Sequence, residues 1–159
     1  MTRSAAIVCL LFGAIAMSPA PAVFAQDGGP DPAALAEECI QRVNALAEQC
    51  SNRVADISAQ CVQEIEQLLE EGHPLRAHYV ARQCVHRIHK TARLCVHRIR
   101  HVCRRCVHAL EALGAPDLAE QVAIACEAAV ESVQAAARDA AQAVRDALPD
   151  VDPPPTDEG

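Results

Sequence analysis

The chain has 159 residues and a formal net charge of −7, and aromatic side chains make up only 2% of it. That length allows one domain, and the scarcity of aromatic residues disfavours recognition of nucleic-acid sequence through base stacking. Much of the 51% hydrophobic content is alanine, so a small helical domain of this composition would be marginally stable without covalent bridges.

Residues 1–25 have the pattern of a secretory signal peptide. Arg3 gives a positive start, the apolar run AAIVCLLFGAIAM follows it, and Val23-Phe24-Ala25 forms a small-residue cleavage site. The apolar run is shorter than the roughly 20 residues that a membrane-spanning helix needs. We therefore expect a secreted or periplasmic protein with no transmembrane segment in the mature chain, which would begin with a short linker at residues 26–30.

The rest of the chain is divided by two stop-start signals, Gly72-His73-Pro74 and Gly114-Ala115-Pro116. A glycine suits the left-handed position after a helix, and a proline cannot continue the helix before it. Asp31 is a good N-cap because a proline follows it. The expected helices cover about residues 32–70, 75–113 and 117–148, and no alternating strand pattern is present. Residues 31–148 should therefore form one all-α domain, followed at 149–159 by a disordered, acidic, proline-rich tail.

Six of the nine cysteines follow a strict eleven-residue spacing, in the runs Cys39, Cys50, Cys61 and Cys84, Cys95, Cys106. Eleven residues are close to three helical turns, so each run forms one stripe along its helix. If the first helix folds back on the second at Gly72-His73-Pro74, each cysteine of the first run lies opposite one cysteine of the second run, because the two are equally far from the turn. Paired disulfides are the default for an even number of cysteines in an oxidising compartment. The predicted bridges are Cys39–Cys106, Cys50–Cys95, Cys61–Cys84 and, by the same symmetry about the second turn, Cys103–Cys126.

The same register aligns apolar residues across both turns. Leu46 lies opposite Ile99 in the first hairpin, and Val96 lies opposite Val133 in the second. The second helix thus has two adjacent apolar faces, and we expect it to lie between the other two. The predicted fold is a three-helix up-down-up antiparallel bundle stapled by four disulfides. Since a disulfide requires Cα atoms about 4.4–6.8 Å apart, the helices must pack closely, which alanine-rich flanks permit.

The first hairpin is similar to the twin CX9C helical hairpins, in which two disulfides clasp antiparallel helices. The resemblance covers about residues 39–106 and concerns architecture alone. This chain differs in having ten residues between successive cysteines, three rungs and a third helix. The resemblance implies a disulfide-clasped hairpin and carries no activity with it.

Charge is concentrated in the second helix. From His73 to Leu110 the chain has nine basic residues, all seven histidines and no acidic residue, whereas both flanking helices are acidic. Opposite charges on neighbouring helices predict complementary packing, although an exposed ion pair contributes only about 0–1 kcal/mol. The charge pattern therefore supports placing the basic second helix beside both acidic helices, but it contributes little to the stability of the bundle.

Six basic residues of the second helix point away from both predicted neighbours. This predicted ridge consists of His86, Arg93, His97, His101, Arg104 and His108. It is either a solvated face or a surface that binds an anionic polymer or an acidic protein surface. Because imidazole in water titrates near pH 6.5, a polyanion would bind more tightly as the pH falls and would be released by salt.

Patterns typical of enzymes and metal sites are weak in this chain. Cys103-Arg-Arg-Cys106 matches the CxxC redox motif but lies in mid-helix, and its two cysteines have different predicted partners. His97 and His101 could chelate a metal from one helix face, but no carboxylate of that helix supports them. No nucleophile triad, phosphate loop or haem-attachment motif is present.

We therefore expect a non-catalytic structural or binding module without a cofactor, and no sequence-specific contact with nucleic acid. The alternative is a thiol-based bundle that binds or stores Cu(I) or another metal, which requires reduced cysteines. Successive cysteines on one helix would be about 16 Å apart. That distance disfavours metal clusters, because each rung offers only two thiolates.

Overall fold

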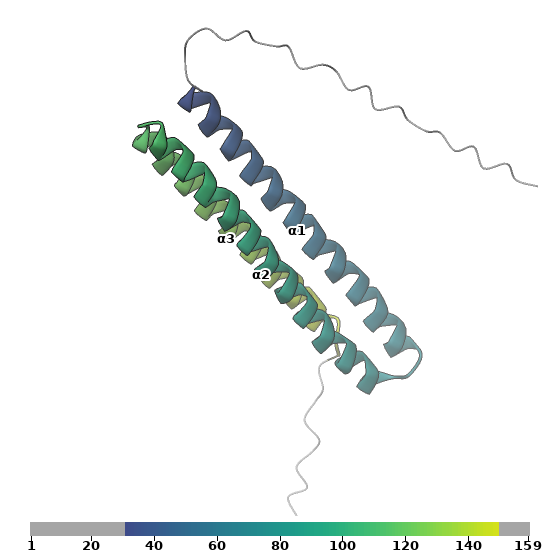
Figure 1. Ribbon diagram of the computed structural model, residues 1–159. Helices are drawn as coiled ribbons and strands as arrows, with labels where there is room; N and C mark the ends of the chain where they lie inside the picture. The colour runs from purple at the N-terminus through teal and green to yellow at the C-terminus, as the bar shows by residue number, and fades with distance from the viewer. Residues whose placement is uncertain (1–30, 150–159) are drawn as a thin grey trace, which may run out of the picture.

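The computed structural model describes residues 31–149, which form three long helices and no strand. The helices are α1 (Pro32–Glu70), α2 (Pro74–Ala112) and α3 (Pro116–Asp146). They alternate in direction along an elongated rod, so that α1 and α3 run parallel and α2 runs against both (Figure 1). The predicted all-α, three-helix, up-down-up fold is confirmed.

Some sequence predictions concern parts of the chain outside the described residues. They are the signal peptide at residues 1–25, the linker at 26–30 and the acidic tail from residue 150 onward. Within the described part of the chain, no helix has both the length and the apolar content that crossing a membrane requires.

Both turns between helices use the same hydrogen bonds. Gly72 has a φ of 76° and donates its N–H to the carbonyl of Leu69 at 3.0 Å, while His73 donates to the carbonyl of Leu68 at 2.8 Å. The turn at Gly114, with a φ of 72°, repeats both bonds. This is the Schellman motif, in which glycine adopts the left-handed conformation at little cost because it has no Cβ.

A proline begins each helix. Pro32 follows Asp31, whose carboxylate accepts a backbone N–H two residues further on at 3.0 Å. The second and third helices begin at Pro74 and Pro116, one residue earlier than predicted. The reason is that proline has the φ of a first helical residue and lacks an N–H that would have no acceptor there. The predicted helix ends differ from the observed ones by at most two residues.

All four predicted disulfides are present. Three of them form a ladder between α1 and α2, and Cys103–Cys126 joins α2 to α3. The Cα–Cα distances are 6.0 to 6.1 Å in every bridge, which is within the range of relaxed disulfides. Both antiparallel registers inferred from cysteine spacing are therefore confirmed.

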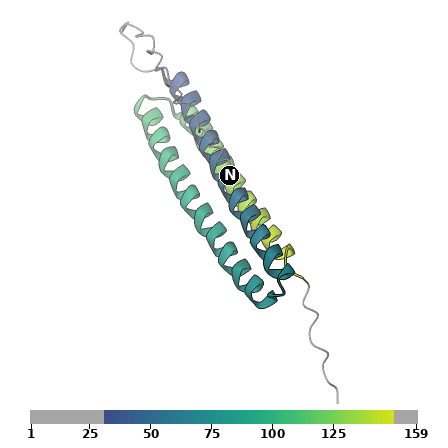
Figure 2. The same ribbon diagram turned by 90° about the vertical axis from the view of Figure 1, so that its right-hand side faces the viewer.

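The helices form a triangle, so α2 does not lie between α1 and α3 as the sequence suggested. Each helix packs along both of the others. Figure 1 shows α1 beside the α2–α3 pair, and Figure 2 shows α2 beside the α1–α3 pair. A buried hydrogen bond from Ser58 Oγ on α1 to the carbonyl of Ala140 on α3, at 3.0 Å, crosses the third seam. No cysteine marks this seam, so the spacing of the cysteines could not predict it.

The core is thin and contains no aromatic ring. Tyr79, the one aromatic residue in the described range, is 62% exposed. The largest fully buried side chains are Ile65, Ile88, Ile99 and Leu110, and most other core residues are Ala, Val or Cys. Small side chains let the helices approach closely enough for the disulfides. The bridges in turn compensate for the modest apolar area that such side chains bury.

Candidate anion-binding groove

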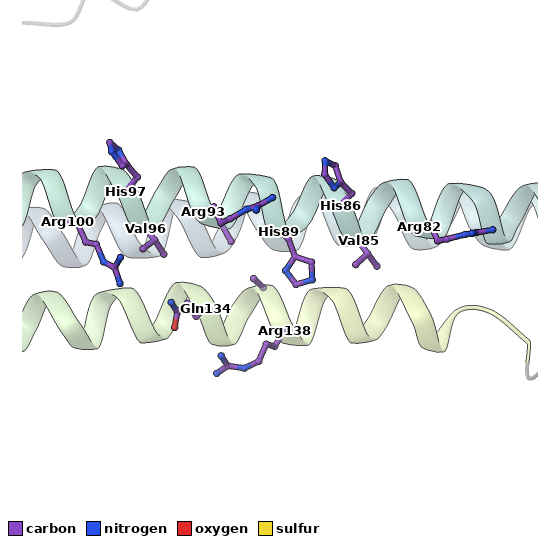
Figure 3. Close-up of a pocket in the computed structure, with 12 residues that line it drawn as sticks. Arg82, Val85, His86, His89, Arg93, Val96, His97, Arg100, Gln134 and Arg138 are labelled. Atoms are coloured by element: carbon purple, nitrogen blue, oxygen red, sulfur yellow. The ribbon is translucent and has the colours of Figure 1, made fainter.

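A shallow groove runs along the seam between α2 and α3. Its floor consists of small apolar side chains, Val85, Ala92 and Val96 from α2 and Ala137 from α3. Figure 3 shows Val85 and Val96 between α2 and α3, and because valine and alanine are short, the seam is left open there. The result is an open channel with an apolar bottom and a polar rim.

Basic side chains line the central part of this channel. Arg82, His86, His89, Arg93, His97 and Arg100 come from α2, and Arg138 comes from α3. No carboxylate lines this stretch, which we call the basic groove, and Gln134 is its one uncharged polar residue. Figure 3 shows His89 and Arg100 directed toward α3, whereas His86 and His97 point away from it. Cationic groups thus lie both within the groove and along its outer edge.

The basic side chains of the groove have no acidic partner in the structure. Between residues 31 and 149 the one ion pair joins His108 Nδ1 to Glu111 Oε2 at 3.2 Å, within α2. The prediction that basic side chains of α2 pair with acidic side chains of α1 and α3 is therefore wrong, because no ion pair joins two helices in the described residues. The apolar stripes face one another at the seams and leave the charged residues of each helix on exposed faces. The groove cations consequently remain available to an external anion.

The channel changes character toward the C-terminal end of α2. There Arg104 and His108 share the lining with Glu127 and Glu131 of α3, and we call this stretch the mixed groove. It is continuous with the basic groove, because Gln134 and two basic residues of α2 line both. The two carboxylates offset the positive charge of the mixed groove, so the basic groove is the more cationic part of the channel.

The structure divides the predicted ridge among three places, and all six of its side chains are exposed. His86, Arg93 and His97 line the basic groove, and His97 also borders the mixed groove with Arg104 and His108. His101 lines a different groove, between α2 and α1, that also contains Glu38 and Arg42. Five predicted residues therefore belong to one continuous channel and His101 does not.

Four basic residues of the basic groove were absent from the predicted ridge. They are Arg82, His89 and Arg100 of α2 and Arg138 of α3. The sequence does contain a signal for Arg138, because the register set by Cys103–Cys126 places it opposite the middle of α2. The prediction considered the outward face of one helix, whereas the groove is formed by two.

Basic residues of α2 recur every eleven residues, as the cysteines do. One row is Arg82, Arg93, Arg104; a second is His86, His97, His108; a third is His78, His89, Arg100. Residues eleven apart lie on one side of a helix at a rise of about 16 Å. The groove therefore carries parallel rows of cations along the axis of α2.

In the described part of the chain, neither a free thiol nor a cluster of metal-ligating side chains is found. Its eight cysteines are all disulfide-bonded, and Cys103 and Cys106 have different partners. Among residues 31–149 no three His, Cys, Asp or Glu side chains come together as a group that could hold a metal ion. His97 and His101 line different grooves. Binding of Cu(I) would require the reduced chain and stays a prediction for that form.

Comparison of the chain with protein-family models, with curated proteins and with solved structures finds no match. The function proposed below therefore rests on the chemistry of the groove alone.

Proposed function

We propose that this protein is a secreted, non-catalytic binding module that holds an anionic partner in the groove between α2 and α3. The observation that carries the proposal is the charge of the basic groove. Seven basic side chains line it, no carboxylate does, and none of the seven forms an ion pair. These side chains repel one another when they are charged, and a bound anion would attract them instead. The anion would not first have to displace a carboxylate of the protein.

The disulfides suit a binding role because they hold both walls of the groove in place. The three-rung ladder attaches α2 to α1, and Cys103–Cys126 attaches α3 to α2 at the end of the basic groove nearest the second turn. A site whose backbone is already ordered loses less conformational entropy when a ligand binds. A thin bundle can thereby offer a rigid, charged surface directly above its small core.

The proposal is tested by removing charge from the groove. In the variant Arg82→Gln/Arg93→Gln/Arg100→Gln we expect binding of heparin, a sulfated probe, to weaken at least about tenfold, since three exposed contacts are lost. The slope of log affinity against log salt concentration should fall by about 2 to 3, because each lost contact no longer releases a counterion. Isothermal titration calorimetry at several salt concentrations measures both quantities.

The matched control removes the same charge from another face of α2. Arg76, Arg87 and Arg98 are exposed, are also spaced by eleven residues and do not line the groove. Their replacement by Gln should change heparin affinity less than about threefold, because these charges would act on bound heparin only from a distance, where salt screens them. Equal losses in the two variants would mean that net charge, not the groove, governs binding. Absence of binding by the unmodified protein would refute the proposed function.

A further inference from the structure

The dimensions and the charge spacing of the basic groove point to one kind of anion. We propose that the groove binds a linear polymer of sulfate or phosphate groups, laid lengthwise along α2, with Arg138 of α3 on the opposite wall. This inference rests on the proposed function and specifies its ligand.

The channel is long, continuous and open at both ends. Beyond Arg82 it continues past His78 and Arg145 toward the ends of α2 and α3, and beyond Arg100 it continues as the mixed groove. From Arg82 to Arg100 alone the rise along the helix is about 27 Å. A compact anion would contact few of the rim residues at once, whereas an extended chain can contact all of them.

The density of cations along the groove matches a polymer better than it matches an acidic protein surface. Seven basic residues over about 27 Å give one per about 4 Å. A single nucleic-acid strand carries one phosphate per about 3.4 Å. One face of an acidic helix offers roughly one carboxylate per turn, or per 5.4 Å. When its three histidines are protonated, the groove is therefore more densely charged than one face of a helical protein partner could match.

The chemistry of the lining favours recognition by charge and not by base or sugar identity. Arginine donates paired hydrogen bonds that fit sulfate and phosphate oxygens. Gln134 is the one side chain in the basic groove with an amide oxygen that could accept a hydrogen bond, and no Phe, Tyr or Trp ring lines the basic groove. The valine and alanine floor is short and so leaves space above it for the chain of such a polymer.

The match in charge density depends on pH. The groups that line the basic groove with its histidines are Arg82, Arg93 and Arg100 of α2 and Arg138 and Gln134 of α3. In the adjoining mixed groove, Arg104 and His108 of α2 and Glu127 and Glu131 of α3 share the lining with His97, and α1 contributes no lining residue to either groove. With neutral imidazoles the four arginines are spaced by about 7 Å on average. Protonation of His86, His89 and His97 brings the average to about 4 Å, so polymer binding should be tighter in acid.

The test is a length series of two polymers, heparin-derived oligosaccharides and inorganic polyphosphate, titrated into the full mature chain at about pH 5.5 and about pH 7.5. Affinity should rise with chain length until the polymer spans about 27 Å and should rise more slowly beyond it. The polymer that binds more tightly at equal charge and length identifies the source of the anionic groups.

A pair of single variants tests the wall formed by α3. Arg138→Gln should weaken binding of the long polymers about fivefold, near the upper range for one exposed ion pair. Arg53→Gln removes the same charge from an exposed position on α1, outside the groove, and should change affinity less than twofold. Because both side chains are exposed, neither change should affect folding, which circular dichroism checks.

Three results would overturn the inference, and they are distinguishable from failure of the proposed function. Affinity that does not depend on polymer length, or equal effects of Arg138→Gln and Arg53→Gln, would exclude a lengthwise polymer while leaving an anion-binding groove. Tighter binding of a folded acidic protein or of polyglutamate than of either polymer would assign the groove to acidic proteins. If none of these anions binds at either pH, the proposed function fails as well.

Discussion

The two seams that α2 forms with its neighbours differ in how they are closed. Three disulfides join α2 to α1, whereas one joins α2 to α3. The seam with α1 is held along its whole length, and the seam with α3 contains the long basic channel. The comparison indicates a division of labour in which the α1–α2 hairpin supplies stability and the α2–α3 seam supplies the exposed surface.

The largest expected effect comes from breaking all four bridges. In the loop-entropy model each bridge alone contributes about 3 to 4.5 kcal/mol, and nested bridges contribute less than their sum. Even half of that sum is comparable with the whole free energy of unfolding of a small domain, about 5–15 kcal/mol. Full reduction should therefore lower Tm by at least about 20 °C, measured by circular dichroism with and without reductant.

Labelling of thiols provides the control for that experiment. The protein, alkylated without reduction, should show no labelled cysteine among residues 31–149 by mass spectrometry. Labels on all eight of these cysteines would contradict the bridges and would make Cu(I) binding the leading hypothesis, to be tested by copper uptake of anaerobically purified protein.

A matched pair of deletions compares the seams directly. Cys61–Cys84 and Cys103–Cys126 both close a separation of 23 residues. The loop-entropy model therefore assigns each bridge, taken alone, the same contribution to the free energy of unfolding. After Cys61→Ala/Cys84→Ala two rungs still hold the hairpin, so we expect a loss of about 1 kcal/mol. After Cys103→Ala/Cys126→Ala no bridge holds α3, and the expected loss is about 3 kcal/mol. Urea denaturation measures both losses.

Heparin binding by the same two variants gives an independent readout. The groove has one wall on α3, so loss of Cys103–Cys126 should weaken binding, while loss of Cys61–Cys84 should not. Equal stability losses and equal affinities would show that helix packing alone holds α3, and the proposed division of labour would be wrong.

The smallest effect concerns the histidines of the groove. An imidazole that gains a proton adds a positive charge, so heparin should bind about tenfold more tightly at about pH 5.5 than at about pH 7.5. The variant His86→Gln/His89→Gln/His97→Gln should lose most of this difference, because its remaining groove cations are arginines, which stay charged across the range. Titrations at both pH values provide the measurement.

The histidine control is His73→Gln/His101→Gln, compared with His86→Gln/His89→Gln, since neither His73 nor His101 lines any part of the channel. It should keep the pH dependence of the unmodified protein. If it loses as much as the groove variant, the effect of pH reflects overall charge and the histidines of the basic groove have no special role.

The fold could be predicted well from the sequence because its strongest constraints are local and periodic. Eleven-residue spacing, two Gly-x-Pro turns and an even number of cysteines fix which helices pair and in which register. The contact between α1 and α3 could not be predicted in the same way. It depends on Ser58, Ala140 and small side chains that carry no distinctive spacing.

The groove was predicted only in part. The excess of basic residues on α2 is evident in the sequence, and five of the six ridge residues line the channel. The shape of the channel depends on short side chains on two helices, and a helical wheel of α2 alone cannot show it. For that reason the prediction did not include Arg138, and it grouped His101 with residues that line a different groove.

The bridges also determine how the protein would respond to mechanical force. If residues 31 and 149 are pulled apart, tension crosses from α1 to α2 at the rung formed by Cys39 and Cys106, and then from α2 to α3 at the remaining bridge. The load-bearing backbone is only 31–39, 103–106 and 126–149, about 34 residue steps. Its contour length is about 120 Å, against about 400 Å for the reduced chain. While the disulfides remain intact, the domain is a short tether with limited extension, even after its helices have unfolded.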